Sequence, residues 1–308
     1  MLEKREWAGR HADDVRRALI LEPRGHPHMV GAVLTEPTSP GAHAGVLFFH
    51  NDAYSSMSGH GIIGVATIAI ERGIIMAGPD EKAIVFDTPA GTVRTVVATK
   101  SLDAASGPQV RVERVTFTNV PAFVLHAGLP VQLGPRQLRA DIAYGGAFYA
   151  IVDAEAAGLS IDMAHGPELR RAGLAIREAV ERATTIVHPS RPAITGLDGT
   201  IFTGPSHDGD ADLRNAVVFA DGAVDRSPGG TGTSAVMAVI DAMGLLGEDR
   251  PFVHEGLLGT RFSGRVSGRT VVNDYPAIVT DIDGSAWITG EHTFFVDDRD
   301  PLKLGFRS

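Results

Sequence analysis

Two short glycine-rich segments combine the residue types that bind small anions and move protons. The first is Ser58-Gly59-His60-Gly61, and the second is Gly229-Gly230-Thr231-Gly232. Each precedes an apolar stretch, and the start of a helix presents unpaired backbone N–H groups and a partial positive charge. Glycine also lets a ligand approach such a backbone closely. Both segments therefore predict binding of a carboxylate or a phosphate.

The two segments belong to an internal repeat. The stretch IIGVATIAIERG runs from Ile62 to Gly73, and TSAVMAVIDAMG runs from Thr233 to Gly244, so corresponding positions are 171 residues apart throughout. Both stretches are apolar around most of a helix circumference, and both end on a glycine. We predict two buried helices, one in each half of a duplicated architecture, whose starts face a common cleft.

A dinucleotide-binding loop is the competing interpretation of the first segment. Residues 59–64 (GHGIIG) match the pattern G-x-G-x-x-G. That pattern normally follows a strand directly, whereas the polar or small residues 51–58 separate it from the preceding apolar run. The second segment also lacks the third glycine. NAD binding is therefore disfavoured.

Strands and helices of an α/β fold would position these segments. Residues 168–183 have helical spacing with a charged outer face, which predicts a surface amphipathic helix. Val120-Pro121 and the turn-like Ala127-Gly128 indicate a domain boundary. Apolar and β-branched runs between turn residues predict strands, of which the clearest are 45–50, 83–87, 92–98, 109–118 and 215–220.

The composition limits the classes of function. The 308 residues, 44% of them hydrophobic, suffice for two domains with separate cores. A net charge of -9 argues against nucleic acid or an acidic membrane as partner. Because the chain has no cysteine, it has no disulfide, no thiolate zinc site and no cysteine catalysis. No apolar run approaches the roughly 20 residues of a membrane-spanning helix, and the first residues lack a signal-peptide core, so a cytoplasmic protein is expected.

Motifs around both segments resemble those of the proline racemase family. Residues 56–61 (SMSGHG) resemble the motif MCGHG, and residues 225–233 (DRSPGGTGT) resemble DRSPCGTGT. The resemblance implies two pseudo-symmetric α/β domains, each a curved sheet around a central helix, as in diaminopimelate epimerase. The first domain would comprise residues 1–125 and about 285–308, and the second residues 126–284. Further similar segments, in the same order along the chain, lie at 22–26, 141–149, 202–205 and 300–306.

Members of this family include proline racemase, 4-hydroxyproline epimerase and trans-3-hydroxy-L-proline dehydratase, and none uses a metal or an organic cofactor. The resemblance thus implies a small-molecule substrate, proline or a hydroxyproline, and it is compatible with a homodimer. It assigns Gly59 and His60 to the first set of substrate contacts. Asp225 matches the acid beside the substrate amine, and Gly230 with Thr231 matches the second backbone cradle for the carboxylate.

In the racemases of the family, two cysteines flank the substrate Cα, and this sequence departs at both positions. Ser58 stands at the first. Its hydroxyl is a far weaker acid than a thiol, whose pKa is about 8.5, so it would act as a base only with help from a neighbour, or it would merely cap the helix. Gly229 stands at the second and has no side chain. Two-base racemisation is then closed unless Thr231, Asp225 or a held water substitutes.

Dehydration needs fewer catalytic groups than racemisation, because one base removes the Cα proton and the 3-hydroxyl leaves with some acid assistance. Dehydratases of the family also lack the second cysteine, and Ala147 resembles their version of that segment. The leading hypothesis is therefore a lyase acting on trans-3-hydroxy-L-proline. The alternatives are a proline or hydroxyproline racemase or 2-epimerase and a catalytically silent amino-acid binding protein.

A third departure concerns the start of the chain. The family's strand segment resembling IDxHTxGEP has no counterpart among the residues before Glu22. Either the sequence starts later than those of its relatives, or the first domain lacks that pair of strands, in which case a sheet edge is expected to be exposed.

Overall fold

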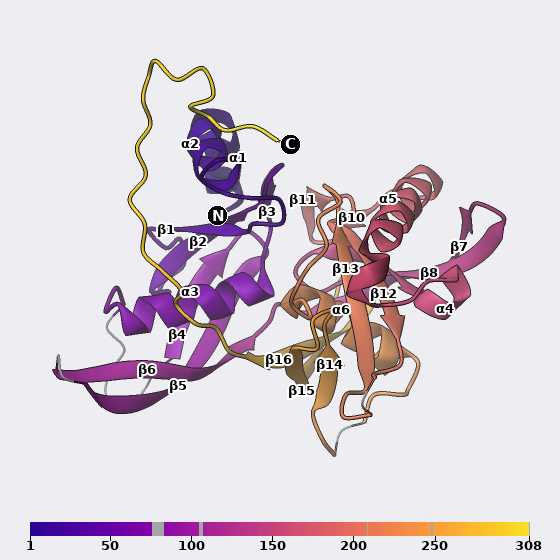
Figure 1. The fold of residues 1–308 in the computed structure, drawn as a ribbon. Helices are drawn as coiled ribbons and strands as arrows, with labels where there is room; N and C mark the ends of the chain where they lie inside the picture. Colours follow the sequence, from indigo (N-terminus) through magenta and orange to yellow (C-terminus); the bar gives the residue numbers. More distant parts are fainter. Residues whose placement is uncertain (76–82, 105–106, 208, 248, 308) are drawn as a thin grey trace. The chain divides into compact units, whose positions relative to one another are not determined.

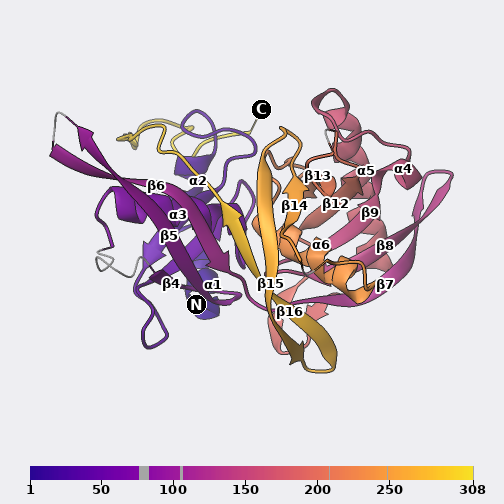
Figure 2. The same ribbon diagram turned by 90° about the horizontal axis from the view of Figure 1, so that it is seen from below.

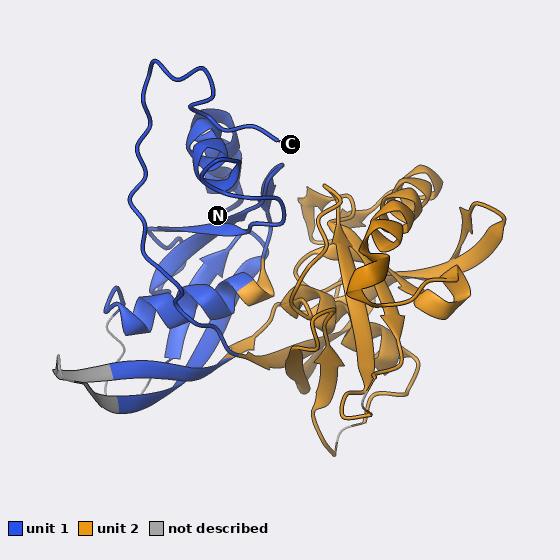
Figure 3. Cartoon of the chain, in the orientation of Figure 1, with its two compact units in different colours: residues 1–57, 61–115, 285–308 blue, residues 58–60, 116–284 orange. Residues whose placement is uncertain are grey.

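The computed structural model describes residues 1–75, 83–104, 107–207, 209–247 and 249–307 (Figure 1). Its backbone contacts divide the chain into two compact units (Figure 3). Unit 1 comprises residues 1–57, 61–115 and 285–308, and unit 2 comprises residues 58–60 and 116–284. The expected division at residue 125 falls inside strand β7, whereas the contacts group residues 116–125 with unit 2.

Unit 1 combines a sheet with three helices, and its strands follow the order β1-β2-β4-β5-β6, with β3 paired to β2. All six residues of β2 are buried, which explains its unbroken apolar sequence. Val112 N–H donates to Glu71 Oε1 at the end of α3 (2.8 Å), which ties that helix to β6. The elements are α1 (Leu2–His11), α2 (Asp13–Ile20), β1 (Gly31–Thr35), β2 (Ala44–Phe49), β3 (Tyr54–Ser55), α3 (Gly59–Glu71), β4 (Ala83–Thr88), β5 (Gly91–Ala104) and β6 (Gly107–Thr118).

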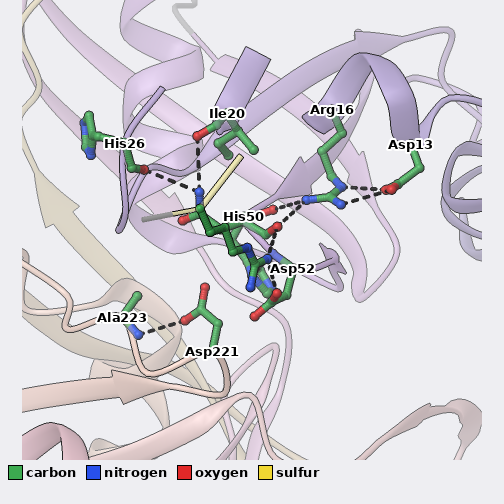
Figure 4. A network of polar contacts seen from close by, with 10 residues as sticks. Asp13, Arg16, Ile20, His26, His50, Asp52, Asp221 and Ala223 are labelled. Atoms are coloured by element: carbon green, nitrogen blue, oxygen red, sulfur yellow. Dashed lines mark hydrogen bonds and ion pairs between the residues drawn. The ribbon is translucent and has the colours of Figure 1, made fainter. Parts of the chain in front are cut away.

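The residues before Glu22 form helices α1 and α2, and a buried arginine on α2 contacts the loop that follows β2 (Figure 4). Arg16 is 5% exposed and pairs with Asp13 (Nε to Oδ1, 2.6 Å). Its Nη1 donates to the carbonyls of His50 (2.8 Å) and Asn51 (2.7 Å). The buried charge of Arg16 is therefore met by a partly exposed carboxylate and two carbonyl acceptors, as burial of an ion requires.

Unit 2 is a larger sheet wrapped around one helix (Figure 2). Its strands follow the order β16-β15-β14-β13-β12-β9-β8-β7, and β16 also pairs with β7 at Ile278–Ala122, so the order returns on itself. The elements are β7 (Ala122–Leu133), β8 (Arg136–Tyr144), β9 (Phe148–Asp153), α4 (Ala154–Ala157), η1 (Met163–His165), α5 (Gly166–Ala183), β10 (Val187–His188), β11 (Arg191–Thr195), β12 (Gly199–Gly204), β13 (Leu213–Phe219), α6 (Gly230–Ala242), β14 (Phe252–Glu255), β15 (Arg261–Val272) and β16 (Tyr275–Gly284).

The two long helices of unit 2 follow from their sequences. Helix α5 buries a stripe at helical spacing, including Leu169, Ile176 and Val180, and keeps its charged face in solvent, so the prediction for residues 168–183 is confirmed. Helix α6 buries every residue from Gly230 to Val239, as its apolar circumference predicts. It contacts β7, β8, β9, β15 and β16.

The predicted strands are confirmed, but two local predictions were wrong. The expected turn at Ala127-Gly128 is a bulge inside β7, where the pairing register with β8 shifts between His126 and Leu129. A glycine with a φ of 62° marks a bulge as readily as a turn. Both repeated helices, predicted to follow Gly61 and Gly232, also begin three residues earlier, at Gly59 and Gly230, so the glycines of each segment lie within the first helical turn.

The expected burial of both repeated helices holds for α6 from Gly230 to Val239 and on one side for α3. In α3, Ile62, Ile63, Ala66 and Ala69 are buried, but Ile68 is 44% exposed. Among the described residues, no helix combines the length and apolarity that a membrane crossing needs.

Candidate active site

The first turns of α3 and α6 touch within unit 2, which includes residues 58–60 (Figure 3). A β-carbon on Gly59 would lie 2.4 Å from the Cα of Gly230, and one on Gly230 would lie 2.7 Å from the Cα of Gly59. Only glycine permits this approach, because real β-carbons do not come so close to backbone atoms. The N–H groups of a first helical turn lack partners within the helix, so two sets of donors and two partial positive charges lie side by side.

Gly229 precedes α6 in a conformation that favours glycine, with φ 74° and ψ 114°. Space is not the constraint, since a β-carbon there would meet Val217 Cγ2 at 3.5 Å and Asp225 Oδ2 at 3.6 Å, which are ordinary contacts. The backbone angle is the constraint, because L side chains rarely adopt such a φ. The position that lacks a side chain therefore also has a backbone conformation that favours glycine.

Replacing Gly229 with alanine is expected to destabilise the protein by about 1–3 kcal/mol, the cost of holding an L-residue in a sparsely populated backbone region. Gly64→Ala is the matched control. Gly64 lies in α3 with open space around it, so the same methyl group should stabilise by about 0.5–1 kcal/mol. Urea unfolding measures both free energies. Equal changes in the two variants would contradict the argument from backbone conformation.

His60 and Asp225 form an ion pair beside the two helix starts. His60 Nδ1 lies 3.4 Å from Asp225 Oδ2, and the two side chains are 25% and 8% exposed. Burial by itself would lower the pKa of His60, but the carboxylate of Asp225 outweighs burial and raises that pKa. Burial would likewise raise the pKa of Asp225, but the charge of His60 and the hydrogen bonds to the carboxylate lower it. The pair therefore favours a carboxylate and an imidazolium.

Ser227 joins the ion pair to the turn before α6. Its N–H donates to Asp225 Oδ1 (2.9 Å), and its Oγ lies 3.2 Å from His60 Nδ1. The same Oγ accepts the N–H of Gly229 (3.1 Å). One hydroxyl thus connects the first segment to the second. Sequence reasoning missed Ser227 as a site residue, although its place in the DRSP motif could have indicated it.

A tyrosine on the sheet forms a hydrogen bond with Thr231, and sequence reasoning missed this tyrosine too. The hydroxyls of Tyr149, on β9, and Thr231 are 2.8 Å apart, and both residues are buried. Burial raises the pKa of Tyr149, so its phenol stays protonated at neutral pH. The signal was its presence in the segment YGGAFY, which resembles the family.

Ser58 immediately precedes α3 and is 8% exposed. It adjoins Gly59, whose Cα abuts Gly230, so its place in the chain fixes it at the junction of the two helix starts. Its role as a base stays a prediction. In the described part of the chain, no three or more His, Asp or Glu side chains are grouped so that they could hold a metal ion.

Comparison with known proteins places this site in a family. The family model described as "Proline racemase" matches residues 1–307. A trans-3-hydroxy-L-proline dehydratase of Bacillus cereus is 41% identical over 305 residues, which are 99% of this chain and 89% of the relative. A 4-hydroxyproline 2-epimerase of Streptosporangium roseum is 42% identical over 307 residues, 99% of this chain and 90% of the relative.

A solved structure supports the same assignment. The crystal structure of a hydroxyproline epimerase from Agrobacterium vitis, with bound trans-4-hydroxy-L-proline, superposes with a TM-score of 0.89 and 31% identity. The match covers 99% of this chain and 86% of that chain. The expected α/β fold class is confirmed by this likeness. The chain belongs to the proline racemase family.

Proposed function

We propose that this protein removes the Cα proton of a proline-type amino acid without a cofactor and dehydrates trans-3-hydroxy-L-proline to pyrroline-2-carboxylate. In this reaction the Cα–H and C3–O bonds break, a carbon–carbon double bond forms between Cα and C3, and the hydroxyl leaves as water. The base would be Ser58. The backbone N–H groups of Gly59, Gly230 and Thr231 would donate hydrogen bonds to the substrate carboxylate.

Gly229 is the observation that carries this choice. Racemisation by two bases needs a proton donor or acceptor on each face of Cα. The residue at the second position has no side chain, and its φ of 74° favours glycine. Elimination needs only one base and an acid for the departing hydroxyl. Relatives about 40% identical include dehydratases, which is consistent with the proposal.

The ion pair supplies an acid for the leaving group in this scheme. Asp225 raises the pKa of His60 against the effect of burial, and the imidazole keeps a quarter of its side chain exposed. The ion pair of His60 with Asp225 is also the specific observation that favours the alternative of a racemase or 2-epimerase, in which a protonated His60 would donate to Cα from the second side. Asp225 would meet the substrate amine in either case, and a silent binding protein would use the same contacts without chemistry.

One incubation in D2O, followed by proton NMR and by chiral chromatography of the proline, distinguishes these functions. With trans-3-hydroxy-L-proline we expect loss of the Cα signal together with the appearance of pyrroline-2-carboxylate. With L-proline we expect no accumulation of the D-enantiomer. Accumulation of D-proline or of the epimer of 4-hydroxyproline would establish the alternative. Binding without any exchange of the Cα proton would leave only a binding protein.

A further inference from the structure

Three fully buried polar residues lie behind the turn that precedes α6. They are Asn215 on β13, Thr233 on α6 and His254 on β14, and each is 0% exposed. Polar side chains are expensive to bury, so such a cluster persists where its hydrogen bonds serve a purpose. None of the three was singled out by the sequence.

The cluster holds the two carbonyls of the turn. Thr233 donates to the carbonyl of Gly229 twice, from its N–H (2.8 Å) and from its hydroxyl (2.6 Å). Asn215 Nδ2 donates to the carbonyl of Pro228 (2.7 Å). His254 lies between these two donors. Its Nδ1 is 2.9 Å from Thr233 Oγ1, and Asn215 Nδ2 is 3.1 Å from Nδ1 and 3.0 Å from Nε2.

A neutral imidazole fits these partners. The Asn215 amide is a donor, so the ring nitrogen that it meets accepts, whereas an imidazolium would direct a proton at that amide. The Thr233 hydroxyl and the ring share the second hydrogen bond. Burial lowers the pKa of His254 to about 3, which agrees with the neutral form.

The carbonyl of one residue and the N–H of the next share one rigid peptide plane and point in opposite directions. Fixing the carbonyl of Gly229 therefore fixes the direction of the Gly230 N–H, and fixing that of Pro228 fixes the Gly229 N–H. A glycine at φ 74° has wide backbone freedom of its own. The backbone of Gly229 must therefore be held by surrounding residues, and the cluster of Asn215, Thr233 and His254 holds it through the two carbonyls of the turn.

We propose that His254 is a positioning residue that acts through Thr233 and Asn215 to hold the turn before α6 and to aim the Gly230 N–H toward the substrate carboxylate. The inference rests on the proposed role of this N–H group in holding a carboxylate. It does not depend on which reaction follows. Its energetic basis is preorganisation, because a donor already aimed costs less entropy on binding.

Matched substitutions test the chain of contacts. His254→Leu removes both ring contacts, while His254→Asn keeps a donor at the position of Nδ1. Thr233→Val removes the hydroxyl without changing shape, while Thr233→Ser keeps it. We expect His254→Leu and Thr233→Val each to weaken binding of L-proline about tenfold, the value of one hydrogen bond. His254→Asn and Thr233→Ser should retain most of the affinity.

Two comparisons separate positioning from general damage. Cyclopentanecarboxylate has the carboxylate without the amine, and pyrrolidine has the amine without the carboxylate. The loss should affect the first ligand in NMR titrations and spare the second. Combining His254→Leu with Thr233→Val should cost no more than either change alone, because both act on one contact. Equal losses for both ligands, or additive losses, would overturn the inference.

Amide hydrogen exchange gives a readout without any ligand. The Gly230 amide should exchange faster in His254→Leu and Thr233→Val than in the two conservative variants. If His254→Leu does not fold, the isosteric pair at Thr233 decides the question by the same measurements. If the natural protein binds no proline, the proposed function fails, while the exchange rates still support or refute the positioning role.

Discussion

Replacing Ser58 with alanine is expected to lower the rates of Cα–H exchange and of elimination by about 10²–10⁴-fold, the usual loss when a general base is removed. Binding should change little. The carboxylate is expected to meet backbone N–H groups and the amine to meet Asp225, and neither contact uses the serine hydroxyl. Deuterium incorporation measures the rates, and calorimetry with L-proline measures the affinity.

Two controls sharpen this result. Ser56→Ala makes the same change two residues earlier, at a buried serine whose hydroxyl accepts from Arg5 (2.8 Å), and it should leave the rate per folded molecule unchanged. Ser58→Cys restores a group with a pKa of about 8.5 and should retain or raise activity. Full activity of Ser58→Ala would mean that the hydroxyl only caps α3 and that the base lies elsewhere.

Replacing Asp225 with asparagine is expected to weaken binding of L-proline by about 10- to 100-fold, because the substrate ammonium loses a charged hydrogen-bond partner. The variant should also lower the pKa of His60. The carboxylate now raises that pKa against the effect of burial, and without it burial acts unopposed. The loss of the imidazolium should therefore move to lower pH. NMR titration of the His60 ring measures this shift alongside calorimetry.

Asp221→Asn is the matched control for this prediction. Asp221 lies four residues earlier in the same unit, and its Oδ1 accepts the N–H of Ala223 (2.8 Å; Figure 4). The control should leave both the affinity for proline and the titration of His60 unchanged. Normal binding of proline by Asp225→Asn would contradict the proposed contact between this aspartate and the substrate amine. An unchanged titration of His60 in this variant would contradict the ion pair.

The sequence by itself determined the elements that depend on local pattern. Unbroken or alternating apolar runs predicted the strands, and the apolar stripe within residues 168–183 predicted α5. Burying one side of a strand or a helix requires apolar residues at that element's period, whichever element packs against it. The repeat at a spacing of 171 residues identified two helices with glycine at their starts. The motifs around them identified the family and the residues worth testing, since motif residues keep their spacing along the chain.

Tertiary structure decided what depends on residues that are distant in sequence. Tyr149, Asn215 and His254 reach the start of α6 from three different strands, and no spacing along the chain shows that they meet. The contact between Gly59 and Gly230 is of the same kind. Backbone angles belong here as well, because a glycine in the sequence permits a positive φ without requiring one. Only the folded chain showed that Gly229 takes a φ of 74° and that the turn expected at Ala127-Gly128 is a bulge, where pairing with β8 overrides the local preference.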